Sequence, residues 1–267
     1  MMRRLFAPLL AAAALAMPNP AAAQVYGGVD RDMPLARFQD PLCPGIVGLA
    51  LGSAQDMVSL IRENATSLGL SLAESETCEP NLIVAVLDDP KGYANQLKAR
   101  RPYLFKDLGR EEKEAFFDAA GPARSWARIL TRTRDGLAIY ESNGLTSPEQ
   151  ATLMAAHSRV FVPTRRDVVF AIVLLDKKAV QGLTVTQVAD YATMRGLGGT
   201  AAERLGGPRD SVLNLFDSGA DARPKGLTRS DQIFLQTLYS TMPNNPAAVT
   251  LAMAERKIAE ASRTAKR

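Results

Sequence analysis

Two cysteines, Cys43 and Cys78, are the residues of this chain best suited to redox or nucleophilic chemistry. A catalytic cysteine needs a thiolate with a base beside it, and neither cysteine has a histidine near it in the sequence. In an oxidising compartment an even pair of cysteines forms a disulfide. Each cysteine also comes just before an apolar, strand-like run, so adjacent strand starts would bring the sulfurs together. We therefore predict a structural Cys43–Cys78 bridge.

The single histidine, His157, is the other residue that could serve as a general base or a metal ligand. No histidine, cysteine or acidic residue lies at ligand spacing from it. It falls between a short helix predicted from Ser147-Pro148-Glu149 and a short strand predicted at Val160 to Val162. We predict a structural or exposed role for His157.

The first 23 residues have the pattern of a secretory signal peptide. Arg3 and Arg4 precede an apolar run from Leu5 to Met17, and Ala21-Ala22-Ala23 matches the small-residue cleavage pattern. The run is about 13 residues long, whereas a membrane-spanning helix needs about 20. The sequence therefore predicts export to the periplasm or the outside, cleavage before Gln24, and no membrane span in the mature protein.

The charge of the mature chain is small. The whole sequence of 267 residues has a formal net charge of +4, and removal of Arg3 and Arg4 leaves +4 − 2 = +2. The basic runs from Arg128 to Arg134 and from Arg256 to Arg267 contain no interleaved aromatic residues for base stacking. This balance excludes nucleic acid as an expected partner, and we predict that both runs are solvated.

Apolar patterning predicts a mixed α/β fold. Strands are expected at Ile46 to Leu51, Leu82 to Leu87, Trp126 to Thr133, Gly136 to Tyr140 and Val168 to Leu175. A helix capped by Ser53 separates the first two strands, and this crossover predicts parallel pairing. Further helices are expected at Gly92 to Ala99, at Arg110 to Ala119, from Thr184 to about Met194, after Thr228, and at Ala247 to Arg267.

The chain from Val168 onward carries a family resemblance. A buried strand is followed by a helix that ends in Gly196-Leu197, then by Asp210-Ser211-Val212-Leu213, and then by a helix from Leu227-Thr228-Arg229-Ser230-Asp231 to Leu238-Tyr239. This order resembles the C-terminal half of zincin-type metallopeptidases. It is also similar to a family of uncharacterised exported bacterial proteins that is a degenerate relative of those enzymes. The resemblance implies a zincin-like mixed sheet.

The zinc-binding H-E-x-x-H residues of that family are missing here. Aligned by its Gly196-Leu197 end, the helix has Ala189 at the position of the first histidine, Asp190 at the position of the glutamate base, and Thr193 at the position of the second histidine. Zinc needs three protein ligands besides its open position. We therefore predict no metal, and Asp190 is at most a candidate catalytic residue.

A second motif points to different chemistry. Leu215-Phe216-Asp217-Ser218-Gly219-Ala220-Asp221 resembles the active-site loop of retroviral-type aspartic proteases, in which two aspartates share one proton. The chain has no second Asp-Ser/Thr-Gly, so a dyad would require a homodimer. In that family the loop leads into an apolar strand, whereas here Arg223-Pro224-Lys225-Gly226 leads to a helix. The alternative is an ordinary turn at Asp217.

These features divide the chain into a signal peptide (1–23), an irregular lead-in (24–44), a zincin-like α/β domain (45–242) and a basic helical tail (243–267). The glycines from Gly196 to Gly207 lack the Gly-Lys-Ser/Thr of a P-loop, and no cofactor is predicted. We expect a non-catalytic binding or assembly component of the cell envelope, whose partner is unknown. The alternatives are an aspartic-type hydrolase that uses Asp217 and a divergent zinc hydrolase.

Overall fold

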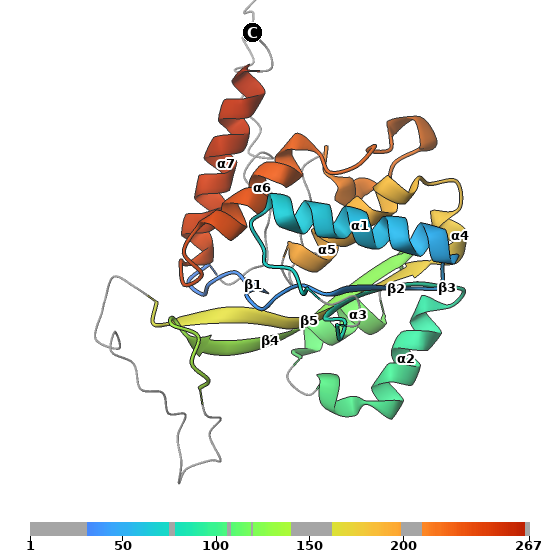
Figure 1. Cartoon of the computed structure of the whole chain (residues 1–267), viewed down its shortest axis with the longest axis horizontal. Coiled ribbons are helices and arrows are strands. Elements are labelled where there is room, and N and C mark those ends of the chain that lie inside the picture. The colour runs from blue at the N-terminus through green and yellow to red at the C-terminus, as the bar shows by residue number, and fades with distance from the viewer. Residues whose placement is uncertain are drawn as a thin grey trace, which may run out of the picture.

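The fold is organised around one long strand, β5 (Thr164–Asp176). One edge of β5 pairs in parallel with β1 (Arg37–Phe38) and β3 (Leu82–Leu87), and the other edge pairs antiparallel with β4 (Ala123–Thr133). β2 (Pro44–Val47) pairs in parallel with β3. The computed structural model describes residues 31–74, 78–105, 108–118, 120–139, 162–198 and 210–264. Within these residues the protein is a mixed α/β fold with a mostly parallel sheet (Figure 1).

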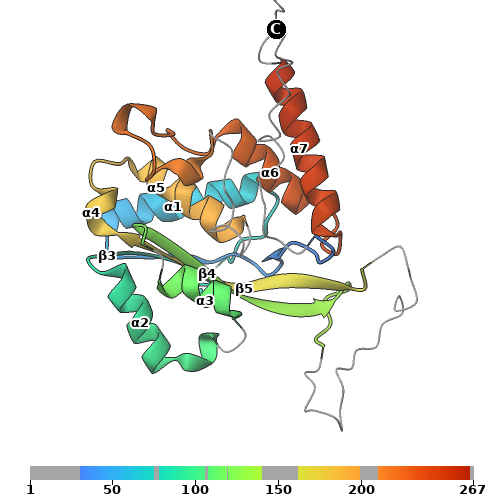
Figure 2. The same cartoon turned by 180° about the vertical axis from the view of Figure 1, so that it is seen from behind.

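Helices cover both faces of this sheet. α1 (Leu51–Ser67), α5 (Val185–Leu197) and α6 (Arg229–Ser240) lie over one face, and α2 (Pro90–Arg100) and α3 (Arg110–Phe117) lie over the other (Figures 1 and 2). The short α4 (Lys177–Val180) follows β5 directly. Because both faces are covered, β5 is buried on both sides, as its continuous apolar run predicts.

Each face of the sheet has its own hydrophobic core. On the side of α1 and α5, Met57 and Ile61 are fully buried against sheet residues such as Val84 and Val173. The helical spacing of Met57 and Ile61 in the sequence predicts this buried stripe. On the side of α2 and α3 the core is aromatic and contains Phe105, Phe116, Phe117 and Trp126.

The first strand and helix have different boundaries from those expected. β2 ends at Val47 rather than near Leu51, because Gly48 turns the chain with a φ of +85°. α1 therefore begins at Leu51, with Ala50 at its N-cap position, and Ser53 lies inside the helix rather than capping it. The parallel pairing of β2 with β3 is confirmed.

Two other strand predictions need correction. Within the expected irregular lead-in, Arg37–Phe38 form β1 because they pair with Asp167 and Val168 of β5. The strand expected at 136–140 is reduced to a single bridge between Arg132 and Ala138, and residue 140 lies outside the described residues.

Helix α5 continues past its predicted end. Gly196 lies inside α5, and the C-cap is Gly198. A Cβ at position 196 would come within 2.6 Å of Leu82 Cδ1, so glycine allows α5 to approach β3 closely. The predicted N-cap hydrogen bond of Thr184 is confirmed, since its hydroxyl accepts from Gln187 N–H at 3.2 Å.

The last helix, α7 (Ala247–Thr264), is anchored by its first half. Its buried residues are Ala247, Thr250, Leu251 and Ala254, and its far end extends away from α6 (Figure 1). In the parts of the chain that the structure describes, no helix combines the length and apolar character needed to cross a bilayer.

The predicted disulfide is present. Cys43 and Cys78 are bonded, and they precede β2 and β3 respectively. Asn81 lies beside the bridge, where its side chain accepts from Cys43 N–H at 2.8 Å and donates to Pro41 carbonyl at 2.9 Å. The bond joins the starts of two adjacent strands and is consistent with an exported protein.

We expect the purified, unreduced protein to show almost no titratable thiol after unfolding in denaturant. Its double variant Cys43→Ser/Cys78→Ser should lose about 2 to 4 kcal/mol of stability, because a bridge across this loop restricts the unfolded chain. Thiol titration and denaturant unfolding measure the two effects. Two reactive thiols per chain would contradict the assignment.

Candidate functional site

Asp190, the aspartate at the expected position of a catalytic base, joins three parts of the fold. Its Oδ1 accepts from Asn64 Nδ2 of α1 at 2.7 Å, and its Oδ2 accepts from Leu227 N–H, just before α6, at 2.8 Å. The same Asn64 amide donates to Thr193 at 3.2 Å. A Cβ on Gly226 would overlap Asp190 Oδ2, which shows how closely the loop packs on the carboxylate. Asp190 is buried, and its contacts hold α1, α5 and the loop before α6 together.

A second buried aspartate, Asp231, fixes the start of α6. Its carboxylate accepts four hydrogen bonds, from Ser211 Oγ at 2.6 Å, Val212 N–H at 2.8 Å, Thr228 N–H at 3.0 Å and Thr228 Oγ1 at 2.9 Å. Burial raises the pKa of Asp231, although these hydrogen bonds act in the opposite direction. The predicted cap of α6 by Thr228 is confirmed, since its hydroxyl accepts from Asp231 N–H at 3.2 Å.

Asp217, the candidate aspartic nucleophile, lies on a different kind of backbone from the one its motif predicts. Leu215 and Phe216 continue a helical turn after η3 (Val212–Asn214) and form no strand. The Asp217 N–H donates to Asn214 carbonyl at 3.1 Å, and its side chain is exposed. His157 and the helix predicted beside it lie outside the described residues. Among the described residues, no three histidine, cysteine, aspartate or glutamate side chains gather closely enough to hold a metal.

Tyr239, at the end of α6, joins that helix to two other elements. Its hydroxyl donates to Leu197 carbonyl of α5 at 3.0 Å and lies 3.4 Å from the Phe38 N–H of β1. The buried Arg37 donates to Leu238 carbonyl, and its guanidinium lies 5.9 Å from the centre of the Tyr239 ring. These contacts place Tyr239 in the framework of the fold.

The arginines of the expected basic run are only partly solvated. Arg132 of β4 pairs with the fully buried Asp167 of β5 at 3.3 Å, and Arg165 donates to the same carboxylate oxygen at 3.0 and 3.2 Å. Arg132 also approaches the exposed Asp40 at 3.7 Å. These ion pairs link the C-terminal end of β4 to the N-terminal end of β5.

Among the described residues, no strand pairs with the middle of the outer edge of β4, around Ala127 and Ile129. Along its other edge, Pro122 carbonyl accepts from Asp176 N–H at 2.7 Å, and Arg134 N–H donates to Pro163 carbonyl at 2.9 Å. In an antiparallel pair, residues that bond to the neighbour alternate with residues whose backbone groups point away. Even-numbered positions of β4 therefore face β5, and odd-numbered positions face outward.

Thr133 confirms this alternation, because its N–H donates outward, to Leu137 carbonyl, at 2.9 Å. The bulge at Arg128/Ile129 does not disturb it, since the register skips Val169 on β5 and adds no residue to β4. The backbone groups of Ala127 and Ile129 consequently point away from the sheet. No described residue forms a hydrogen bond with them.

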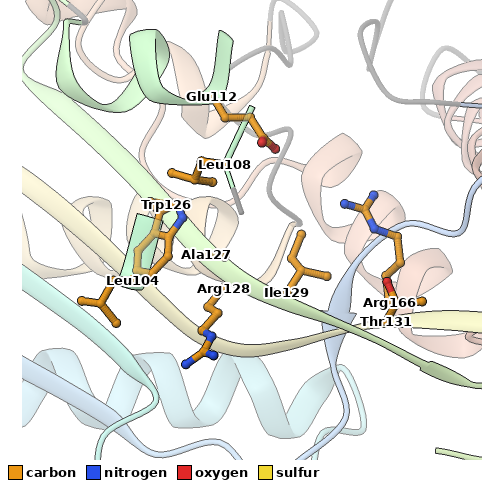
Figure 3. A pocket seen from close by; sticks show the side chains of 9 residues that line it. All are labelled: Leu104, Leu108, Glu112, Trp126, Ala127, Arg128, Ile129, Thr131 and Arg166. Atoms are coloured by element: carbon orange, nitrogen blue, oxygen red, sulfur yellow. The ribbon is translucent and has the colours of Figure 1, made fainter. Parts of the chain in front are cut away.

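A pocket of about 140 Å³ lies along this edge (Figure 3). It is lined by Leu104, Leu108, Glu112, Trp126, Ala127, Arg128, Ile129, Thr131 and Arg166. Residues 126 to 129 are consecutive on one strand, and consecutive strand residues point to opposite faces. A pocket that contacts all four must therefore run along the strand edge, where the backbone is accessible. Its volume is well above the roughly 15 Å³ that one water needs.

The pocket has a wall that α3 holds in place. Glu112 Oε2 accepts from Gly109 N–H at 2.9 Å, which satisfies the N-cap backbone donor of α3 and restrains the glutamate beside the strand. On the strand side, the Trp126 ring packs against Phe105 at 4.8 Å and Phe170 at 6.0 Å between centroids. The site therefore combines a rigid aromatic base with an accessible strand backbone.

Comparison with protein-family models, with curated proteins and with solved structures finds no match to this chain. The function of the site therefore has to be inferred from its own residues.

Sequence patterns alone do not reveal this site. They predict the strand from Trp126, but its position at the edge of the sheet depends on its pairing with β5. The available signal is the alternation of large and small residues from Trp126 to Ile129, which is typical of any half-buried strand. An edge strand differs from a central strand only in what lies beside it.

Proposed function

We propose that this chain is an exported, non-catalytic binding protein of the cell envelope that takes up an extended peptide segment of a partner along the free edge of β4. In this mode a peptide adds a strand to a sheet, backbone hydrogen bonds provide affinity, and side-chain pockets provide specificity. The observation that carries the proposal is the pocket that follows β4 beside the outward backbone groups of Ala127 and Ile129.

The zincin-like framework forms part of this proposal. The order of an antiparallel edge strand, a central strand and the buried helix α5 is compatible with it. Asp190 supports the non-catalytic part, because both of its carboxylate oxygens are engaged in hydrogen bonds that join helices. No contact among the described residues favours either enzyme alternative.

A peptide titration tests the proposal. The probe is the heptapeptide Thr-Val-Thr-Gln-Thr-Val-Thr, blocked at both ends, because alternating β-branched residues favour an extended chain. We expect saturable binding to the purified mature chain, with a Kd of about 1 mM or tighter. The same peptide with its alternate backbone amides N-methylated should bind at least about tenfold more weakly, because it cannot donate to the strand edge.

Variants at Ile129 locate the binding to β4. Ile129→Pro removes an outward N–H, a change that an edge strand tolerates, and should weaken binding by about tenfold. Ile129→Val shortens the side chain but keeps the N–H, and should bind normally. Circular dichroism and melting temperature establish that both variants are folded. Equal affinity for the plain and the N-methylated peptide, or no binding of either, would overturn the proposal.

A further inference from the structure

Trp126 brings an unused hydrogen-bond donor into the pocket. Trp126 is only 7% exposed, and its buried Nε1–H has no hydrogen-bond partner among the described residues. The nitrogen-bearing edge of the ring faces the pocket, on the side of Leu108 and Glu112 (Figure 3). Buried indole N–H groups usually have a partner. A hydrogen-bond acceptor on a ligand would satisfy the N–H of Trp126.

The charges around the pocket favour an acceptor that is negative. Two guanidinium groups, those of Arg128 and Arg166, line it against the single carboxylate of Glu112. That carboxylate is already an acceptor for Gly109 N–H. On the strand itself, Arg132 is paired with Asp167 and Asp40, and Arg124 is buried and donates to the Phe116 carbonyl, so neither adds charge to the pocket. A chain lying along β4 at the pocket therefore meets the two guanidinium groups of Arg128 and Arg166 against one carboxylate.

The strand edge, the indole donor and the positive charge together define one kind of ligand. We infer that the pocket binds the carboxylate side chain of a glutamate or aspartate in an extended peptide docked on β4, with Trp126 Nε1–H as the donor. Arg128 extends away from the indole nitrogen (Figure 3) and contributes its positive charge to the pocket without sharing that hydrogen bond. This inference rests on the proposed function. A lysine at the same peptide position is disfavoured by the two arginines, and a glutamine keeps an acceptor but loses the charge.

The test uses the blocked heptapeptide Thr-Val-Thr-X-Thr-Val-Thr, in which X is Glu, Gln or Lys. We expect the Glu peptide to bind the mature protein about tenfold more tightly than the Gln peptide, and the Lys peptide to bind most weakly. The preference for Glu should decline as salt is raised. Equal binding of the three peptides would overturn the inference and leave strand addition intact, whereas absence of all binding would overturn both.

Three substitutions test which pocket residues produce the preference for the Glu peptide. Trp126→Phe keeps an aromatic ring but removes the N–H, so it should weaken Glu-peptide binding by about tenfold, and its melting temperature reports the packing lost with the smaller ring. Arg128→Gln should reduce the Glu-over-Gln ratio several-fold. Glu112→Gln should increase that ratio, because it removes a repelling charge, and its melting temperature reports any loss of the α3 cap.

The matched control is Arg229→Gln, which makes the same change of charge on α6, over the opposite face of the sheet. It should leave the Glu-over-Gln ratio unchanged. An equal fall of the ratio in Arg128→Gln and Arg229→Gln would show that net charge alone sets the preference, and would overturn the assignment to the pocket. Unaltered Glu-peptide binding by Trp126→Phe would overturn the role of the indole N–H.

Discussion

Replacing Asp231 by alanine is expected to lower the free energy of unfolding by about 3 to 4 kcal/mol, a large share of the stability of a typical domain. The side chain is fully buried and accepts from Ser211, Val212 and Thr228. Alanine would leave these donors buried without partners, and each such group destabilises the fold by about 1 to 3 kcal/mol. Urea unfolding followed by circular dichroism measures the difference.

Ser211→Ala is the control for this prediction. It removes one donor to Asp231, together with the hydroxyl that accepts from Leu213 N–H at 3.2 Å, and leaves the other backbone and Thr228 donors paired with the carboxylate. We expect a loss of about 1 to 2 kcal/mol, in the range of a single cap. Equal losses for Asp231→Ala and Ser211→Ala would mean that the carboxylate is not the centre of the network.

Gly48→Ala should have the second largest effect on stability, a loss of about 3 kcal/mol. Gly48 has a φ of +85°, and a Cβ there would overlap the carbonyl oxygen of Val86. The left-handed conformation alone costs a residue with a side chain about 1 to 2 kcal/mol. The clash adds to this cost, because it involves the backbone of β3 rather than the end of a flexible side chain. Urea unfolding measures the loss.

Substitutions at two other glycines separate the energetic cost of the left-handed backbone conformation from the cost of the clash with Val86. Gly69 has a φ of +78° but open space around its Cα, so Gly69→Ala should cost only about 1 kcal/mol. Gly52 lies in α1, where an added methyl group would have no atom within 4 Å, and Gly52→Ala should stabilise the helix by up to about 1 kcal/mol. Equal effects of Gly48→Ala and Gly69→Ala would show that the Val86 contact is unimportant.

Local patterns predict many of the elements that position the site. The run from Leu82 to Leu87 coincides with β3, and the caps Thr184 and Thr228 mark the starts of α5 and α6. These features depend on residues close together in the chain, where apolar spacing and capping chemistry act directly. The disulfide is predictable because Cys43 and Cys78 are the two cysteines and each precedes a strand.

Boundaries that depend on packing are harder to predict. Glycine is a residue type at which helices often end, yet Gly196 lies inside α5. Its missing side chain makes room for Leu82. Likewise, Asp190 can be aligned with a catalytic position, but its partners Asn64 and Leu227 come from elements distant in the sequence. Only the folded chain identifies what a buried carboxylate contacts.

Residue patterns along the chain establish an α/β protein with a disulfide, a set of capped helices and the lack of an H-E-x-x-H zinc motif. The three-dimensional arrangement is needed to show that β4 is an edge strand, that Ala127 and Ile129 present their backbone outward, and that Trp126, Glu112 and Arg128 line one pocket. The physical reason is that backbone hydrogen bonding has the same local pattern in every strand. Which edge stays free depends on the long-range order of strands in the sheet.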